Sequence, residues 1–135
     1  MKWLEKYGDY AYALLRIVSG AMLSFHGMQK IFGVFSAFHP AVGSQIWCGG
    51  IIELAGGLAI SLGFLTRCAA FVCSGLMAVA YAQFHWKLQL DSRFFPAINK
   101  GELALLYCLV FFFIACRGAG SWSLDAWIAK RKRPR

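Results

Sequence analysis

Four apolar stretches, separated by short polar breaks, run through this 135-residue chain. Hydrophobic residues make up 59% of the sequence and charged residues only 15%, and the Lys and Arg residues gather at the chain ends and at the breaks. A soluble domain of this size could not bury so much apolar surface. The pattern therefore predicts that a bilayer is the solvent for most of the chain and that the chain crosses it as α-helices.

Each apolar stretch is close to the length that a helix needs to span a bilayer, about 20 residues. We expect the spans at about residues 10–32, 44–65, 68–86 and 101–116. The break between the second and third is so short that these two should form a tight helical hairpin. The predicted fold class is all-α: one domain over residues 1–135, an integral membrane four-helix bundle of up-down-up-down topology, with helices crossing at about 20°.

An even number of spans puts both termini on one side of the membrane, and the basic residues indicate which side. Nine Lys and Arg residues lie on the terminal side and four on the other. Cytoplasmic loops carry the excess of positive charge, so both termini are expected in the cytoplasm. All five tryptophans fall close to predicted span ends, where amphipathic rings prefer to lie.

A short amphipathic segment is predicted after the fourth span. The Gly-Ala-Gly sequence at 118–120 should end the span, and Ser121 or Ser123 should then cap a short helix that contains Trp127. We expect this helix to lie along the inner membrane surface. The basic residues that follow it would attract anionic lipid by about 1 kcal/mol each: Lys130, Arg131, Lys132, Arg133 and Arg135.

The net charge of +8 does not indicate a nucleic-acid partner. A nucleic-acid site needs Lys and Arg spread over one exposed face. Here these residues flank apolar segments instead, so the expected partner of the charge is the surface of the lipid bilayer.

Several charged or polar side chains fall inside the apolar stretches, where each is costly unless it faces the interior and finds a partner. With the termini inside, all except Arg16 fall in the outer half of the bilayer. We therefore predict one polar site between the helices that opens outward. Its predicted members are five polar residues and two tyrosines at the wall: His26, Lys30, Glu53, His85, Glu102, Tyr81 and Tyr107.

The spacing of these residues supports a shared site. His26 and Lys30 are four residues apart and so share one helix face. A second stripe of small and polar residues runs along the third span: Ser74, Ala78, Tyr81 and His85.

A glycine repeat in the second span orients Glu53. Gly49, Gly56 and Gly63 recur every seven residues, and Glu53 falls on the same stripe. Small residues mark the places where membrane helices approach closely, so Glu53 should face the bundle interior while the glycines serve packing.

Simpler roles stay open for most of these residues. Lys30 and Glu102 could extend to the interface, and His85 beside Trp86 could be an interfacial residue. Arg16 is expected to be a structural anchor or an ion-pair partner. Glu53 lies about two turns inside the apolar stretch, so it is either half of a buried pair with Lys30 or His26, or a functional acid.

The chain resembles the DoxX family of small four-helix membrane proteins. The resemblance covers nearly the whole chain through motifs in order: LR at 15–16, HGMQKIFG at 26–33, ELAGG at 53–57, LGFLTR at 62–67, NKGELALLY at 99–107 and GAGSWSLD at 118–125. The residues that match the family pattern are Arg16, His26, Lys30, Glu53 and Glu102.

The resemblance implies a multi-pass protein of the bacterial inner membrane. Family members have been connected with quinol- or thiosulfate-linked oxidoreductase complexes and with resistance to redox stress. Distant four-helix relatives are similar to assembly factors or chaperones of other membrane proteins, so the family alone does not fix a reaction.

Two classes of function follow as expectations. The first is a redox-associated subunit whose outer-half cavity binds a quinone, with His26 or His85 contacting an oxygen and Glu53 relaying the proton. The sequence has no CxxCH haem motif and no GxGxxG nucleotide motif. Electrons would therefore come from a partner redox protein or from the quinone itself, and whether the chain is itself an enzyme stays open.

The second class is a protein without catalysis, in which the polar site holds a lipid, a small ligand or the helix of a partner during assembly. A homo-oligomer is compatible with either class. A metal site built from His26, His85, Glu53 and Glu102 ranks lowest, because their spacing matches no short metal motif.

Overall fold

The computed structural model describes residues 1–132, which fold into helices and loops without a β-strand. Arg133 and Arg135 of the predicted basic cluster lie outside the described residues. Four long helices occupy the four apolar stretches and agree with their predicted positions to within three residues at each end: α2 (Gly8–Phe32), α3 (Gln45–Leu62), α4 (Thr66–Ala80) with its continuation, and α6 (Glu102–Arg117).

Shorter elements fill the ends and the longest loop. A π-helix, η1 (Tyr81–Trp86), continues α4 without a break. The remaining elements are α1 (Lys2–Glu5), the 3₁₀-helix η2 (Ser92–Phe94), α5 (Pro96–Asn99) and α7 (Leu124–Arg131).

Local sequence signals explain where the helices begin and end. Ser44 caps the start of α3 by accepting a hydrogen bond from the Trp47 N–H at 3.2 Å. Gly33 and Gly63 end α2 and α3 in the left-handed conformation, with φ of 66° and 70°. Ser123, one of the two predicted caps, accepts from the Ala126 N–H at 3.2 Å and so begins α7.

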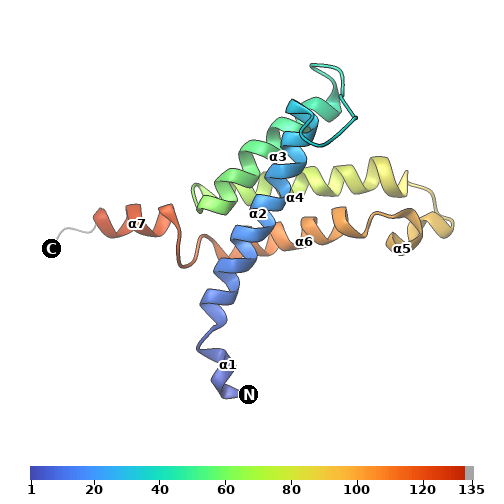
Figure 1. Cartoon of the computed structure of the whole chain (residues 1–135). Helices are drawn as coiled ribbons and strands as arrows, with labels where there is room; N and C mark the ends of the chain where they lie inside the picture. The colour runs from blue at the N-terminus through green and yellow to red at the C-terminus, as the bar shows by residue number, and fades with distance from the viewer. Residues whose placement is uncertain (133–135) are drawn as a thin grey trace.

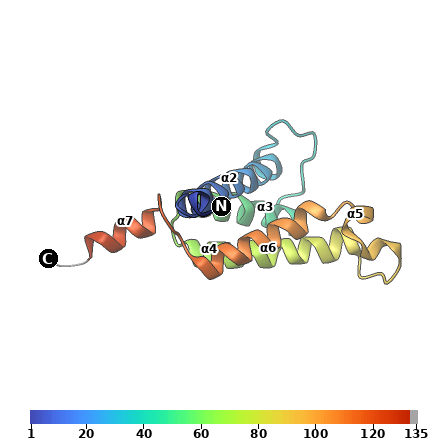
Figure 2. The same cartoon turned by 90° about the horizontal axis from the view of Figure 1, so that it is seen from below.

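The long helices associate in two pairs that cross one another. Helix α2 packs along α3, and α4 packs along α6, while α3 makes the main contact between the pairs. Figures 1 and 2 show the α2–α3 pair lying across the α4–α6 pair, rather than four helices aligned as in the predicted up-down bundle. Buried side chains fill the crossing, among them Leu23, Ile60, Cys73 and Phe111.

A seam of small residues joins α2 to α3. A Cβ atom on Gly20 would lie 2.6 Å from the Ser61 backbone nitrogen, and one on Gly57 would lie 2.6 Å from the Gly20 carbonyl oxygen. A Cβ on Gly27 would overlap the backbone of Leu54. The two backbones therefore touch along the pair, as expected where small residues bring membrane helices together.

The three glycines of the predicted stripe in the second span do not pack against the same helix. Gly56 faces Cys73 of α4, whereas Gly49 has only Leu76 nearby, at 3.7 Å from a built Cβ. Gly63 ends the helix, and a Cβ there would overlap Ser123. The close approach to α2 is made instead by Gly50 and Gly57, each one position further along the chain, because one residue turns the direction of a side chain by about 100° around a helix of 3.6 residues per turn.

Arg16 ties the C-terminal end of α3 to the segment before α7. Its guanidinium is fully buried and donates to the carbonyls of Ile60 and Ser61 at 2.6 and 2.8 Å. It also donates to the Trp122 carbonyl at 2.7 Å and to the Ser121 carbonyl at 3.3 Å. The fixed fork of donors on arginine suits this task, which an ammonium could not perform at four carbonyls.

Asp125 caps the start of α4 from across the chain. Its carboxylate accepts from the Leu65 N–H at 2.9 Å, and from the Thr66 N–H and hydroxyl at 3.0 and 2.8 Å. Burial acts to raise the pKa of Asp125, but these hydrogen bonds outweigh it and the pKa lies below its usual value. Arg67 completes the arrangement by donating to the Ala115 and Cys116 carbonyls at the end of α6, at 3.0 and 2.6 Å.

Two helical segments are long and apolar enough to cross a membrane by length and composition, namely Gln45–Leu62 and Thr66–Trp86. Helix α2 has the length, at 25 residues, but carries Arg16, His26 and Lys30. Helix α6 has 16 residues, a rise of about 24 Å against a hydrocarbon core of about 30 Å. That α2 and α6 also span the bilayer, and that α7 lies on its surface, stay predictions.

Candidate functional site: a polar cavity between the helix pairs

A cavity of about 280 Å³ lies between the two helix pairs. It receives side chains from α2, α3, the α4–η1 helix and α6. Six of its lining residues carry a side-chain group that can form hydrogen bonds: His26, Lys30, Glu53, His85, Lys100 and Tyr107. The other six are apolar: Leu23, Met77, Ala80, Phe84, Leu103 and Ala104.

An ion pair between α2 and α3 forms one wall. The Lys30 ammonium donates to Oε1 of Glu53 at 2.5 Å, and the Glu53 side chain is almost fully buried. Gly50 makes room for the lysine, because a Cβ there would lie 2.9 Å from the Cβ of Lys30. The second carboxylate oxygen, Oε2, is buried and has no hydrogen-bond partner among the described residues.

Tyr107 of α6 forms the facing wall. Its ring stacks on Phe111, with centroids 5.3 Å apart and planes at 5°, and it meets the His26 ring edge-on at 6.4 Å. These contacts hold the ring in one orientation. The Tyr107 hydroxyl is buried and, like Glu53 Oε2, has no partner within residues 1–132.

The π-helix η1 brings His85 and Phe84 to the cavity. A π-helical turn changes the direction of the side chains that follow it, and such turns are frequent at functional sites. His85 Nδ1 lies 3.3 Å from the Asn99 carbonyl oxygen, and the His85 ring stacks on Tyr81 at 6.5 Å. This contact fixes the imidazole at the cavity edge.

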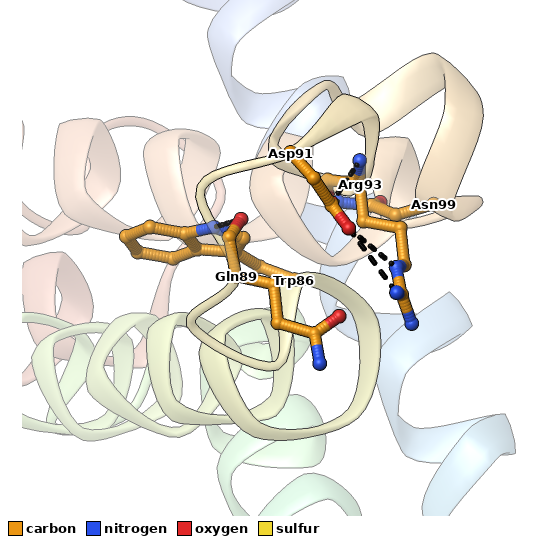
Figure 3. Close-up of polar contacts among 5 residues, drawn as sticks. All are labelled: Trp86, Gln89, Asp91, Arg93 and Asn99. Atoms are coloured by element: carbon orange, nitrogen blue, oxygen red, sulfur yellow. Dashed lines mark hydrogen bonds and ion pairs between the residues drawn. The ribbon is translucent and has the colours of Figure 1, made fainter.

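The loop after η1 is held by polar contacts of its own (Figure 3). The Trp86 indole donates to the Gln89 carbonyl at 2.8 Å, and Arg93 forms an ion pair with Asp91 at 3.1 Å. The hydrogen bond from the Arg93 N–H holds the pKa of Asp91 below its usual value. Asn99 then donates to the Arg93 carbonyl at 2.8 Å, which fixes the chain just before Lys100 enters the cavity lining.

Five of the seven predicted site residues therefore surround one cavity, and two do not. Tyr81 lies behind His85, where its hydroxyl donates to the Phe94 carbonyl at 3.1 Å. Glu102 is exposed and absent from the lining, because the first turn of α6 directs it away from the other helices. The predicted stripe of the third span also changes phase, with Met77 buried and Ala78 exposed.

Lys100 is the polar lining residue that the sequence did not single out. It is one of the four basic residues counted above on the side away from the termini, and it adopts the left-handed conformation, with φ of 60°, at the turn that starts α6. Such a conformation is uncommon outside glycine and is often found at functional sites. One indication of this role is present in the sequence, because Lys100 directly precedes the predicted start of the fourth span at residue 101.

The cavity combines one buried acceptor with several donors. Lys30 and Glu53 offset each other's charge, and Lys100 adds a cation beside the two imidazoles. The described residues contain no group of three or more His, Cys, Asp or Glu side chains close enough to hold a metal ion. A small molecule that both donates and accepts hydrogen bonds fits this donor set better than a metal ion does.

Comparisons with known proteins place the chain among relatives. A model of the DoxX family matches residues 11–86, more than half of the chain. A protein of Haemophilus influenzae, described as uncharacterized, is 41% identical over 129 residues, which cover 93% of this chain and 96% of the relative. No solved structure matches the chain.

Proposed function

The chain belongs to the DoxX family of membrane proteins, and from this we propose that it is a redox-associated subunit of the bacterial inner membrane whose polar cavity binds a quinone. One observation carries the proposal. Two polar atoms from opposite helix pairs, Glu53 Oε2 and the Tyr107 hydroxyl, are buried at the cavity without partners in the described chain. Buried polar groups in proteins are nearly always hydrogen-bonded, so this pair calls for a ligand.

The two atoms offer complementary hydrogen bonds. The Tyr107 hydroxyl can donate to a carbonyl oxygen, and Lys100 can donate beside it. Glu53 Oε2 can only accept while the carboxylate is ionised, so it suits a hydroxyl group. A quinone head presents carbonyls when oxidised and hydroxyls when reduced. Tyr107 and Lys100 could donate to the carbonyls, and Glu53 could accept from the hydroxyls.

The size of the cavity is compatible with one ring. Ligand sites commonly measure about 300–1,000 Å³, and this cavity of about 280 Å³ lies just below that range. The apolar half of the lining, including Leu23 and Phe84, suits the faces of a planar ring.

Proton transfer is the chemistry that the chain itself can contribute. Glu53, already hydrogen-bonded to Lys30, can take a proton on its free oxygen and pass it on. His26 and His85 line the same cavity, and their imidazole nitrogens can donate or accept hydrogen bonds there. A bound quinone would carry the electrons, and a partner redox protein would supply or remove them.

The proposed topology has four passes with both termini in the cytoplasm. The excess of basic residues on the terminal side supports this orientation, since nine lie there against four on the other side. A reporter fused after Arg135 should then be active only in the cytoplasm. Activity of that fusion only outside the cytoplasm would overturn the orientation.

Native mass spectrometry with lipid extraction tests the ligand. We expect a quinone to co-purify with the wild-type protein and to fall at least about tenfold in the Glu53→Gln variant. Glu102→Gln is the matched control, because Glu102 is the exposed carboxylate of the family pattern outside the cavity. A stable partner protein in all three samples, without any bound small molecule, would contradict quinone binding and favour an assembly role.

A further inference from the structure

An apolar groove of about 460 Å³ runs between α2 and α6, next to the polar cavity. These two helices belong to different pairs, so their facing sides diverge instead of packing tightly. The groove is lined by aliphatic side chains that include Leu14, Val18, Met22, Leu106 and Val110.

The groove and the polar cavity adjoin one another. Leu103 and Tyr107 line both spaces, so the wall of the cavity is also the end of the groove. A molecule with its head beside the Tyr107 hydroxyl would therefore have the groove on the other side of the Leu103 and Tyr107 side chains, with no helix between the two spaces.

The groove offers nothing to a polar ligand. Ser19 is its one polar side chain besides Tyr107, and the Ser19 hydroxyl already donates to the Leu15 carbonyl at 2.6 Å. Val18 and Leu106 are 51% and 59% exposed, so the groove opens toward the surroundings of the helices. In a bilayer those surroundings are hydrocarbon, which suits a flexible apolar chain and excludes a charged head.

We propose that the ligand of the cavity is an amphiphile, with its polar ring head between Glu53 and Tyr107 and a long hydrocarbon chain in the α2–α6 groove. This inference rests on the proposed function, since it names the class of quinone: one with a lipid-like chain that enters sideways from the bilayer. A small soluble quinone would use only the cavity.

Two probes separate the head site from the groove: a benzoquinone with a ten-carbon alkyl chain, and the same ring with a methyl group in place of the chain. Binding is measured by native mass spectrometry or calorimetry on protein in nanodiscs of one lipid composition. Val18→Trp and Leu106→Trp fill the groove from its two sides. Leu109→Trp is the control, because Leu109 is equally exposed on α6, at 59%, but does not line the groove.

We expect both groove variants to weaken binding of the long-chain probe by at least about tenfold, while the methyl probe binds as to wild type. Leu109→Trp should leave both probes unchanged, and Glu53→Gln should weaken both. Wild-type affinity of the groove variants for the long-chain probe would overturn the inference and leave the head site standing. Failure of both probes to bind wild type would overturn the proposed function instead.

A second copy of the chain is the rival occupant of the groove. It predicts a dimer in native mass spectra that dissociates in Val18→Trp and Leu106→Trp, with unchanged binding of the long-chain probe. That result would assign the groove to a protein interface and overturn the inference.

Discussion

Thr66 donates both its backbone N–H and its hydroxyl to a single oxygen of Asp125, at 3.0 and 2.8 Å. The start of α4 has no side-chain cap of its own, because Leu65 occupies the cap position. Asp125, 59 positions after Thr66, therefore supplies the cap. The turn between α3 and α4 is thus held by the segment that leads into α7.

Asp125→Asn should weaken this connection. The amide keeps one acceptor but presents an N–H₂ group toward N–H donors, so at least one hydrogen bond is lost. We expect the free energy of unfolding to fall by about 1–2 kcal/mol, as for removal of a helix cap. Thermal unfolding in detergent micelles measures the change, and Glu5→Gln, at an exposed carboxylate of α1, should leave the midpoint where it is.

Acid should act through the same carboxylate. Its pKa is lower in the folded protein than in the unfolded chain, so its contribution is complete above the unfolded value, about 3.9, and is lost as the pH falls through the folded value. Hydrogen exchange at the Thr66 amide should therefore accelerate below about pH 3.9, beyond the intrinsic effect of pH. Equal protection of this amide in wild type and Asp125→Asn across that range would contradict the cap.

Arg16→Lys should destabilise the protein although the charge is kept. A lysine cannot reach the Ile60 and Trp122 carbonyls together, so buried acceptors lose their donors. We expect a loss of about 2–3 kcal/mol, the range for hydrogen bonds to charged groups. The measurement is chemical unfolding monitored by tryptophan fluorescence, and a midpoint equal to wild type would show that the fork geometry is dispensable.

Two glycine substitutions should have opposite signs. Gly57→Ala places a methyl group against the Gly20 carbonyl and should destabilise by about 1–3 kcal/mol. Gly75→Ala, in the middle of α4, meets open space and should stabilise by about 0.5–1 kcal/mol. The melting temperatures of the two variants provide the comparison, and a shift in the same direction for both would argue against a tight seam.

The Lys30–Glu53 pair can be dissected by a double-mutant cycle. Lys30→Met leaves the nearly buried Glu53 without its counter-charge and should cost about 2 kcal/mol, less than for a fully buried pair because 29% of the lysine side chain is exposed. Adding Glu53→Gln should recover most of that loss. Additive single effects on the unfolding free energy would mean that the two groups are not coupled.

The helices could be predicted from the sequence because the apolar runs are a local signal, whereas the second span was predicted to pass Gly63, which in fact ends α3. The crossing of the two pairs could not, since it depends on where surfaces fit after the helices have formed. Helical phase was the weaker guide. It placed Glu53 correctly inside, but it grouped Ala78 with Ser74 on one stripe of the third span, although Ser74 is buried and Ala78 is exposed.

The candidate site was partly visible for the same reason. His26, Lys30 and Glu53 lie within regular helices, where spacing predicts which face they share, and the structure brings them together. Glu102 and Lys100 stand at the start of a helix, where an error of about two residues, half a helical turn, exchanges the inward and outward faces. The long-range cap by Asp125 had no signal in the sequence, because nothing local links it to Thr66.

The backbone contact between α2 and α3 also determines how the molecule can move. Helices that touch backbone to backbone have no flexible side chains between them through which to slide, so Gly20 and Gly57 lock this pair into one stiff body. The α4–α6 pair contacts the α2–α3 pair through side chains where the two pairs cross. The angle between the pairs is therefore easier to change than the packing within the α2–α3 pair. Glu53 belongs to one pair and Tyr107 to the other, so a change in the angle between the pairs would alter the separation of the two side chains that line the cavity.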